Sequence, residues 1–244
     1  MQQLFIPEYG TIKINSFKPL CHKQLGVMAI EKYGFPPFID ASCRREPDFE
    51  NPFPSITALC RQGKFAPHLR KNNIVVYITT GGTFKPYKLG HHLIAILQVE
   101  EVYKTHELGK RGYINANLPI PNNCMVEETR PYKFDQTAGG EMSADILKKY
   151  LALSEELRER ANAELIKDWD NDYLQRSLTY QCFIKTKSLY TNVQNPIRLL
   201  RSDFQYIFGK LPNTRTPNII SESSFIRLGK FIGLDITLGQ YKFY

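Results

Sequence analysis

The residues best suited to chemistry lie together in one proline-rich stretch, residues 35–61. Its five prolines exclude a continuous helix or a central strand, because each proline removes a backbone donor and restricts the residue before it. Its apolar residues are too numerous for a disordered segment. The sequence therefore predicts an ordered loop with charged side chains around aromatic faces, and these side chains are Asp40, Arg44, Arg45, Glu46, Asp48, Glu50 and Arg61.

Two roles are open for these charges. In one, the arginines and carboxylates pair with each other, for example Arg44 and Arg45 with Glu46 and Asp48, and only hold the loop together. In the other they bind nucleic acid, because arginines bind phosphates or guanine edges, carboxylates accept from exocyclic amino groups and aromatic rings stack on bases. Most phenylalanines of the stretch should still be core. The candidate nucleic-acid-binding residues are Asp40, Ser42, Arg44, Arg45, Glu46, Asp48, Arg61, Tyr77, Lys85, Tyr87 and His91.

The overall charge agrees with an anionic partner. The formal net charge is +8 and the pI is about 9.1, which favours association with a polyanion. We expect nucleic acid, with DNA favoured over RNA, and leave the oligomeric state open. The N-terminus lacks the features of a signal peptide and no apolar run is long enough to span a bilayer, so we expect no membrane partner and a cytoplasmic location.

An enzymatic alternative uses the loop over residues 40–64. Asp48 and Glu50 could hold magnesium while Lys64 positions water, as in a metal-dependent nuclease or a base-processing enzyme. Such a core needs its acid and lysine on a strand, whereas Lys64 follows a glycine in a connector. The common signatures of hydrolases, nucleotide-binding loops and zinc proteases are absent, and five widely spaced cysteines form no Cys-x-x-Cys pair. We therefore expect no metal or other cofactor and assign no catalytic residue.

The elements that must position the loop are those of an α+β domain. The strongest strands are residues 74–80 and 93–103, a hairpin whose basic and aromatic connection contains Phe84, Lys85, Tyr87, Lys88 and His91. Other expected strands are 11–17 and 178–184, a short helix is expected from Ser55, a last one over 224–231, and residues 104–136 should be mostly irregular with one edge strand.

One long helix is predicted over residues 143–169. Ser143 is its expected N-cap, and apolar residues recur every three to four positions from Ile146 to Trp169. We regard the region of about residues 141–176 as a helical insertion in a single domain spanning 1–244. Its charged outer face is typical of a solvated surface, although a protein-interaction subunit that uses this face stays a third possible function.

Three segments resemble a known family. They are Ser42–Glu50 leading to Pro54–Arg61, the basic connector before residue 74, and Asp203–Gly209, where Ile207 interrupts a Phe-x-Tyr-Phe-Gly signature. Together they resemble bacterial nucleotide-modification-associated domains, which look like relatives of the PUA, ASCH, EVE and YTH folds. The resemblance implies a small, strongly curved mixed β-barrel with helices in its crossovers. It also implies a pocket for a modified or extruded base, in DNA modification or phage defence.

Overall fold

The computed structural model describes residues 2–80, 85–87, 90–140, 143–211 and 217–242. Its strands are β1 (Gln2–Tyr9), β2 (Ile12–Phe17), β3 (Ser55–Thr57), β4 (Ile74–Thr79), β5 (His91–Tyr103), β6 (Phe183–Thr191), β7 (Ile197–Leu199), β8 (Asn218–Ile219) and β9 (Leu234–Tyr241). Its α-helices are α1 (Gln24–Tyr33), α2 (His106–Asn115), α3 (Ala144–Leu151), α4 (Glu155–Thr179), α5 (Arg201–Phe208) and α6 (Glu222–Phe231). Short 3-10 turns are η1 (Leu20–His22), η2 (Gln62–Lys64), η3 (Ala66–His68) and η4 (Phe134–Gln136).

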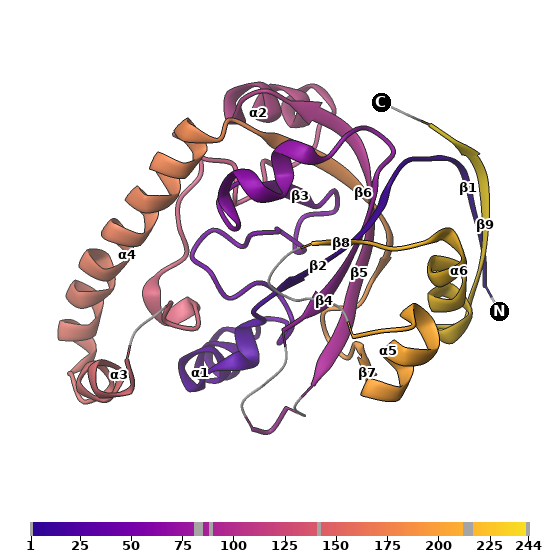
Figure 1. Cartoon of the computed structure of the whole chain (residues 1–244). Helices are drawn as coiled ribbons and strands as arrows, with labels where there is room; N and C mark the ends of the chain where they lie inside the picture. The colour runs from indigo at the N-terminus through magenta and orange to yellow at the C-terminus, as the bar shows by residue number, and fades with distance from the viewer. Residues whose placement is uncertain (1, 81–84, 88–89, 141–142, 212–216, 243–244) are drawn as a thin grey trace.

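A curled mixed sheet forms the centre of the fold (Figure 1). Its strand order is β3-β6-β5-β4-β2-β8, with β7 also paired to β5. The pairing of β2 with β4 is parallel and the other pairings are antiparallel. Register shifts at Tyr77/Ile78 and Val99/Glu101 mark irregularities of the kind that bend and twist a sheet. The predicted α+β class with a curved mixed sheet is confirmed, and the sheet is a half-barrel, since β3 and β8 do not pair among the described residues.

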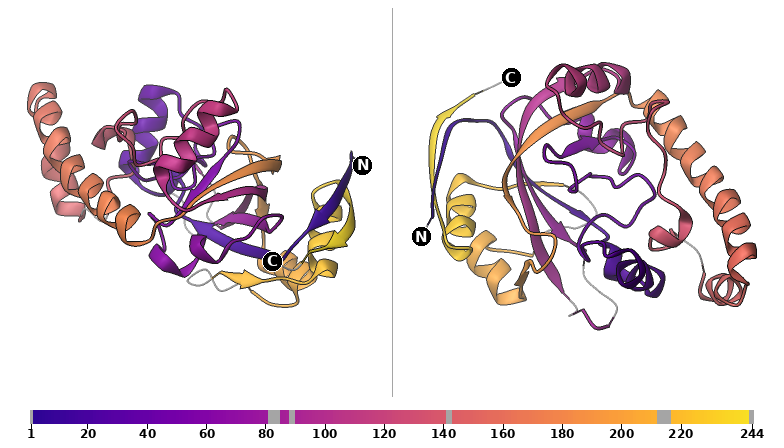
Figure 2. Two further views of the ribbon diagram at one scale, coloured as in Figure 1. Left: turned by 90° about the horizontal axis from the view of Figure 1, so that it is seen from above. Right: turned by 180° about the vertical axis from the view of Figure 1, so that it is seen from behind.

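Both faces of the sheet are covered, as β4 shows. Successive side chains of a strand point to opposite faces, so Val75 and Tyr77 join one core cluster while Ile74, Val76 and Ile78 join another. The second face packs against α5, α6 and the separate parallel pair β1–β9 (Figure 1). The first face, which carries Val75 and Tyr77, lies opposite the proline-rich loop, α1 and the long helix α4 (Figure 2). The loop therefore lies between the sheet and α4.

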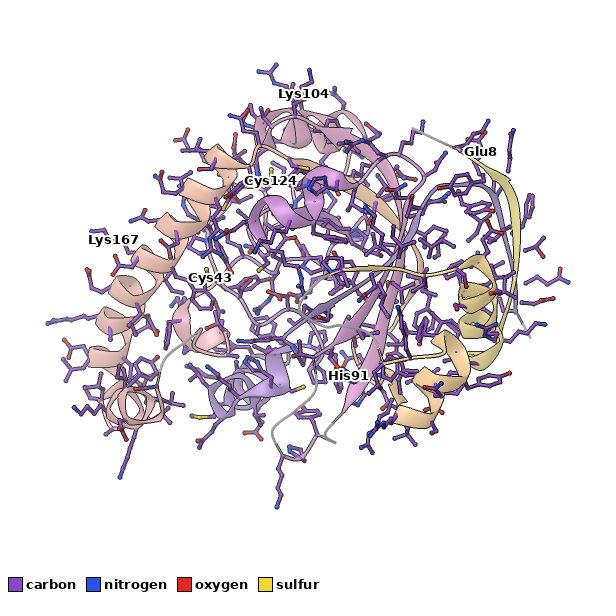
Figure 3. The ribbon with its side chains drawn as sticks, in the orientation of Figure 1. Glu8, Cys43, His91, Lys104, Cys124 and Lys167 are labelled. Carbon is purple, nitrogen blue, oxygen red and sulfur yellow. The ribbon has the colours of Figure 1, made fainter. Side chains whose placement is uncertain are left out.

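The predicted helix over 143–169 is two helices. Ser143 caps α3 by accepting from the backbone N of Ile146, as predicted. Ser154 caps α4 in the same way, through the N of Leu157, and this second cap begins a new helix that continues to Thr179. A single continuous helix was therefore the wrong interpretation. Lys167 points away from the molecule on the outer side of α4 (Figure 3).

Other elements differ from the prediction where pairing overrides local signals. Ser55 begins strand β3, which pairs with β6, and caps no helix. The strand expected over 178–184 begins only at Phe183, because α4 extends to Thr179. The expected irregular region contains α2, capped by Thr105. The hairpin of β4 and β5 is confirmed, while Phe84 and Lys88 of its connection lie outside the described residues.

Candidate functional site

Arg44 is buried in a two-point ion pair with α4. Its Nε and Nη2 donate to the two carboxylate oxygens of Asp170 at 2.6 and 2.8 Å, and its Nη1 donates to Thr129 Oγ1 at 3.0 Å. Only 4% of the residue is exposed. A buried guanidinium must be paired and hydrogen-bonded, and Arg44 satisfies this requirement inside the protein. The bond to Asp170 joins the proline-rich loop to α4.

Arg45 is fully buried, with 0% exposure. Its Nη1 donates to the carbonyls of Asp40 and Ser42, both at 3.0 Å, and its Nη2 donates to the carbonyl of Gln136 at 2.9 Å. Its Nε pairs with Glu50 at 3.2 Å. The expectation that Arg44 and Arg45 face a ligand is therefore wrong. They pair internally, with Asp170 and Glu50 in place of Glu46 and Asp48.

Four more predicted residues lie away from the cavity described below. Asp48 is buried and stabilises the loop, accepting from the backbone N of Asn122 at 2.8 Å and of Glu50 at 3.1 Å. His91 contacts the carbonyl of Thr79 at 2.7 Å and packs edge-on against Phe204, on the second face of the sheet. The remaining two are Lys85, which is exposed, and Tyr87, which is half-buried near Phe38.

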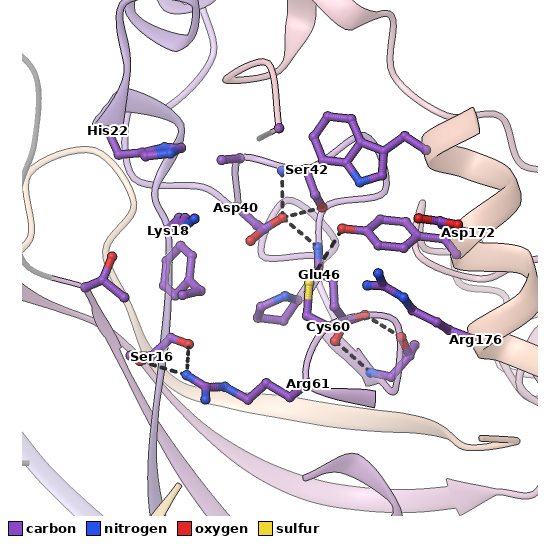
Figure 4. A pocket seen from close by; sticks show the side chains of 18 of the residues that line it. Ser16, Lys18, His22, Asp40, Ser42, Glu46, Cys60, Arg61, Asp172 and Arg176 are labelled. Carbon is purple, nitrogen blue, oxygen red and sulfur yellow. Dashed lines mark hydrogen bonds between the residues drawn. The ribbon is translucent and has the colours of Figure 1, made fainter. Parts of the chain in front are cut away.

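A cavity of about 860 Å³ lies between the curled sheet, the proline-rich loop and α4 (Figure 4). Five predicted residues meet on its wall, and they are Asp40, Ser42, Glu46, Arg61 and Tyr77. Sequence reasoning missed others as site residues, among them Lys18, His22, Trp169, Tyr173 and Arg176. The periodic spacing on α4 predicted packing positions, and nothing local distinguishes a residue that packs on core from one that lines a cavity.

Asp40 is the most distinctive group of this cavity. Its Oδ1 accepts three hydrogen bonds, from Ser42 N at 2.9 Å, Ser42 Oγ at 2.5 Å and Glu46 N at 3.0 Å. Its Oδ2 has no hydrogen-bond partner among the described residues (Figure 4). The residue is only 4% exposed, and burial raises the pKa of its carboxyl although these donors and Arg45 oppose the shift. One carboxylate oxygen is thus fixed within the loop, and the residue also lines the cavity.

Both carboxyl oxygens of Glu46 already accept hydrogen bonds from within the protein. Its Oε1 accepts from Thr57 N at 2.8 Å, and its Oε2 from Thr57 Oγ1 at 2.5 Å and Asn123 Nδ2 at 2.8 Å. Burial raises the pKa of Glu46 to about 8 against these donors. The protonated form is therefore favoured at neutral pH, and Glu46 is a structural group behind the cavity wall.

Aromatic rings and cations complete the wall. Trp169 lies with its ring centre 6.2 Å from that of Tyr173 on α4. Arg61 donates from Nη2 to the carbonyl and hydroxyl oxygens of Ser16 at 3.0 and 2.9 Å. Arg176 donates to the carbonyl of Leu59 at 2.8 Å. The cavity therefore combines flat apolar surfaces with an acceptor and with charged side chains of both signs.

Cys60 also lines the cavity, with its Sγ 3.6 Å from the Tyr173 hydroxyl. Burial, and then the nearby carboxyls of Asp40 and Glu46, raise the pKa of the thiol well above its usual range. Since the thiolate is the nucleophilic form, this environment opposes nucleophilic chemistry at Cys60.

The residues of the predicted metal-dependent enzyme have separate roles. Asp48 accepts loop hydrogen bonds, Glu50 pairs with Arg45, and Lys64 is exposed on η2. Within the part of the chain that the structure describes, no three histidine, cysteine or acidic side chains are grouped to hold a metal ion. The arrangement therefore gives no support to catalysis by Asp48, Glu50 and Lys64.

Comparisons of the chain with protein-family models, curated proteins and solved structures gave no match in any of the three. The resemblance to PUA-like domains accordingly stays a prediction. Among the described residues, no helix is both long and apolar enough to cross a bilayer.

Proposed function

We propose that this protein binds nucleic acid and receives a modified or extruded base in the cavity between the curled sheet and α4. The observation that carries the proposal is that Asp40 Oδ2 has no hydrogen-bond partner within the described part of the chain, in a cavity that is also lined by Trp169 and Tyr173. A base that leaves a duplex loses both its stacking and its base-pair hydrogen bonds, so a receiving pocket must replace both. Aromatic rings and a fixed acceptor are the groups that can do so.

The dimensions of the cavity and the basic side chains in its wall support the same proposal. Small-molecule sites typically occupy roughly 300–1,000 Å³, and a volume of about 860 Å³ leaves room for a substituted base and part of its backbone. Lys18 and Arg61 lie across the cavity from Asp172 and Arg176 (Figure 4). Together with the net charge of +8, the cations Lys18, Arg61 and Arg176 are suited to bind the phosphates that flank an extruded nucleotide. A PUA-like module that recognises modified DNA bases agrees with these features.

The unique tryptophan makes the proposal directly testable. Trp169 lines the cavity and is the one tryptophan of the chain, so its fluorescence reports on occupancy. The experiment is a salt-series titration with short DNA and RNA strands that carry a plain or a modified base. We expect saturable quenching, a steep salt dependence from phosphate contacts and a preference for one modification. Unchanged Trp169 fluorescence with every strand at low salt would refute the proposal.

A matched pair of variants tests whether the positive charge of Lys18 contributes to nucleic-acid binding. Lys18→Gln should weaken the affinity for every strand and reduce the salt slope by about 1, because each phosphate contact contributes about that much. Lys167→Gln removes the same charge from the outer side of α4 (Figure 3) and should change neither quantity. Equal effects of the two variants would show that only the overall charge attracts nucleic acid.

A further inference from the structure

At Asp40 and Ser42 the cavity wall presents acceptors, because the nearby backbone N–H groups are already used within the loop. The N–H groups of Ser42 and Glu46 both point to Asp40 Oδ1, at 2.9 and 3.0 Å. The hydroxyl of Ser42 also donates to this oxygen, at 2.5 Å. What remains toward a ligand is Asp40 Oδ2 and the lone pairs of Ser42 Oγ, for which the described residues supply no donor.

This acceptor pair is held in place from behind. Arg45 donates to the carbonyls of both Asp40 and Ser42, each at 3.0 Å, and is itself fully buried. Its guanidinium lies over the ring of Tyr132, with its centre 4.2 Å from the ring centre. Arg45 therefore fixes the orientation of Asp40 and Ser42 and does not itself line the cavity.

Resting on the proposed function, we propose that the base held here presents two adjacent N–H donors to Asp40 Oδ2 and Ser42 Oγ, which is the pattern of a guanine-type edge. Guanine has N1–H beside its 2-amino group. Adenine and cytosine place a ring-nitrogen acceptor beside their amino group, and thymine places a carbonyl on each side of its one N–H. Only the first pattern pairs both acceptors, and an unpaired buried acceptor is costly.

The side of the cavity formed by α4 can bind the third group of the guanine edge, the carbonyl O6. In guanine the carbonyl O6 lies next to N1–H and needs a donor. Arg176 has five N–H donors, of which the described residues take one, by Leu59, and Tyr173 offers a hydroxyl beside Cys60. Both residues line the cavity. A donor–donor–acceptor edge therefore meets acceptors on the loop side and donors on the helix side.

The decisive comparison is guanine against hypoxanthine, which lacks only the 2-amino group. We would titrate the full-length protein with oligonucleotides that differ at one unpaired position, carrying guanine, hypoxanthine, adenine, cytosine or thymine, and follow Trp169 fluorescence. We expect guanine to bind about tenfold or more tightly than hypoxanthine, because the missing amino group leaves a buried acceptor without its donor. This comparison needs no variant and so does not depend on a mutant that folds.

The variant Asp40→Asn then tests whether Asp40 Oδ2 is the acceptor that recognises guanine. The three donors around Oδ1 fix the amide oxygen in that position, so the amide NH2 must replace Oδ2 and turn an acceptor into a donor. The guanine preference should disappear. Asp168→Asn changes an exposed carboxyl on the opposite, α4 side of the cavity and should leave the preference unchanged.

The outcomes separate this inference from the function on which it rests. Equal quenching by all five bases, or a preference for another base, overturns the guanine assignment and leaves the base pocket standing. An Asp40→Asn protein that keeps its guanine preference also overturns it. No quenching by any strand overturns both the assignment and the pocket.

Discussion

Arg44 and Asp170 lie 126 positions apart in the chain and form a two-point ion pair, with Nε–Oδ1 at 2.6 Å and Nη2–Oδ2 at 2.8 Å. The pair connects the loop wall of the cavity to its helix wall. Arg44 is buried, whereas Asp170 is partly exposed. Two parallel N–H···O bonds fix distance and orientation together, so this contact sets how far α4 stands from Asp40.

Arg44→Ala should destabilise the fold by about 3 kcal/mol, because it leaves Asp170 and Thr129 without their buried partner. Urea denaturation would measure the free energy of unfolding. The control is Arg160→Ala, which removes an exposed pair with Glu156 and should cost less than about 1 kcal/mol. Similar losses in the two variants would contradict a structural role for Arg44.

Gly140→Ala should disturb the cavity. Gly140 has φ +53°, and a Cβ there would lie 3.3 Å from the ring of Trp169. We expect a loss of about 1 kcal/mol from the backbone together with a shift in the emission of Trp169. Gly209→Ala is the control, since Gly209 has φ +73° but open space around its Cβ position. It should show the loss of stability with no change in emission, and an emission shift in both variants would count against the contact.

Arg61→Gly should separate binding from stability. Arg61 adopts φ +60°, a conformation that glycine takes without strain, so the substitution offsets part of the lost contact with Ser16. We expect the free energy of unfolding to change by less than about 1 kcal/mol while the affinity for DNA falls and its salt slope decreases. Asn117→Gly, at φ +54° on an exposed turn, should leave binding unchanged. Full DNA affinity in Arg61→Gly would remove Arg61 from the proposed site.

The pH dependence of stability should report on Glu46. Burial raises its pKa from 4.5 to about 8 in the folded state, so the folded protein holds a proton that the unfolded chain has lost in this range. The free energy of unfolding must therefore fall as pH rises through this window. His92 and His106 have the opposite effect on the free energy of unfolding. Their pKa values are lowered to about 4, so they increase stability as pH rises from about 4 to about 6.5 and add little change above that pH.

Between pH 6.5 and 8 we expect the wild-type protein to lose about 1 to 2 kcal/mol of stability, since one proton per pH unit corresponds to about 1.4 kcal/mol. Glu46→Gln has no proton to lose at this position and should give a clearly smaller slope. Chemical denaturation at a series of pH values would measure both proteins. The same slope in the variant would show that another group is responsible.

Much of the framework follows from local signals. The β-branched run of β4 and the apolar start of β5 predict a buried hairpin, and the apolar content of residues 35–61 predicts an ordered loop. Ser143 is recognisable as a cap from its position before a helical pattern. These signals act over a few residues, through backbone preference and hydrophobic spacing, and the sequence contains them in full.

Partners distant in the chain decided the site. The sequence placed Arg44 and Arg45 in the right loop, but their partners Asp170 and Gln136 lie 126 and 91 positions away. Whether a guanidinium faces a ligand or a carboxylate depends on which distant group is near enough to offset its desolvation. Trp169 likewise lines the cavity only because α4 folds back over the loop. The sequence by itself therefore determined an ordered loop rich in charged side chains, and tertiary packing alone decided which of these charges pair internally and which line the cavity.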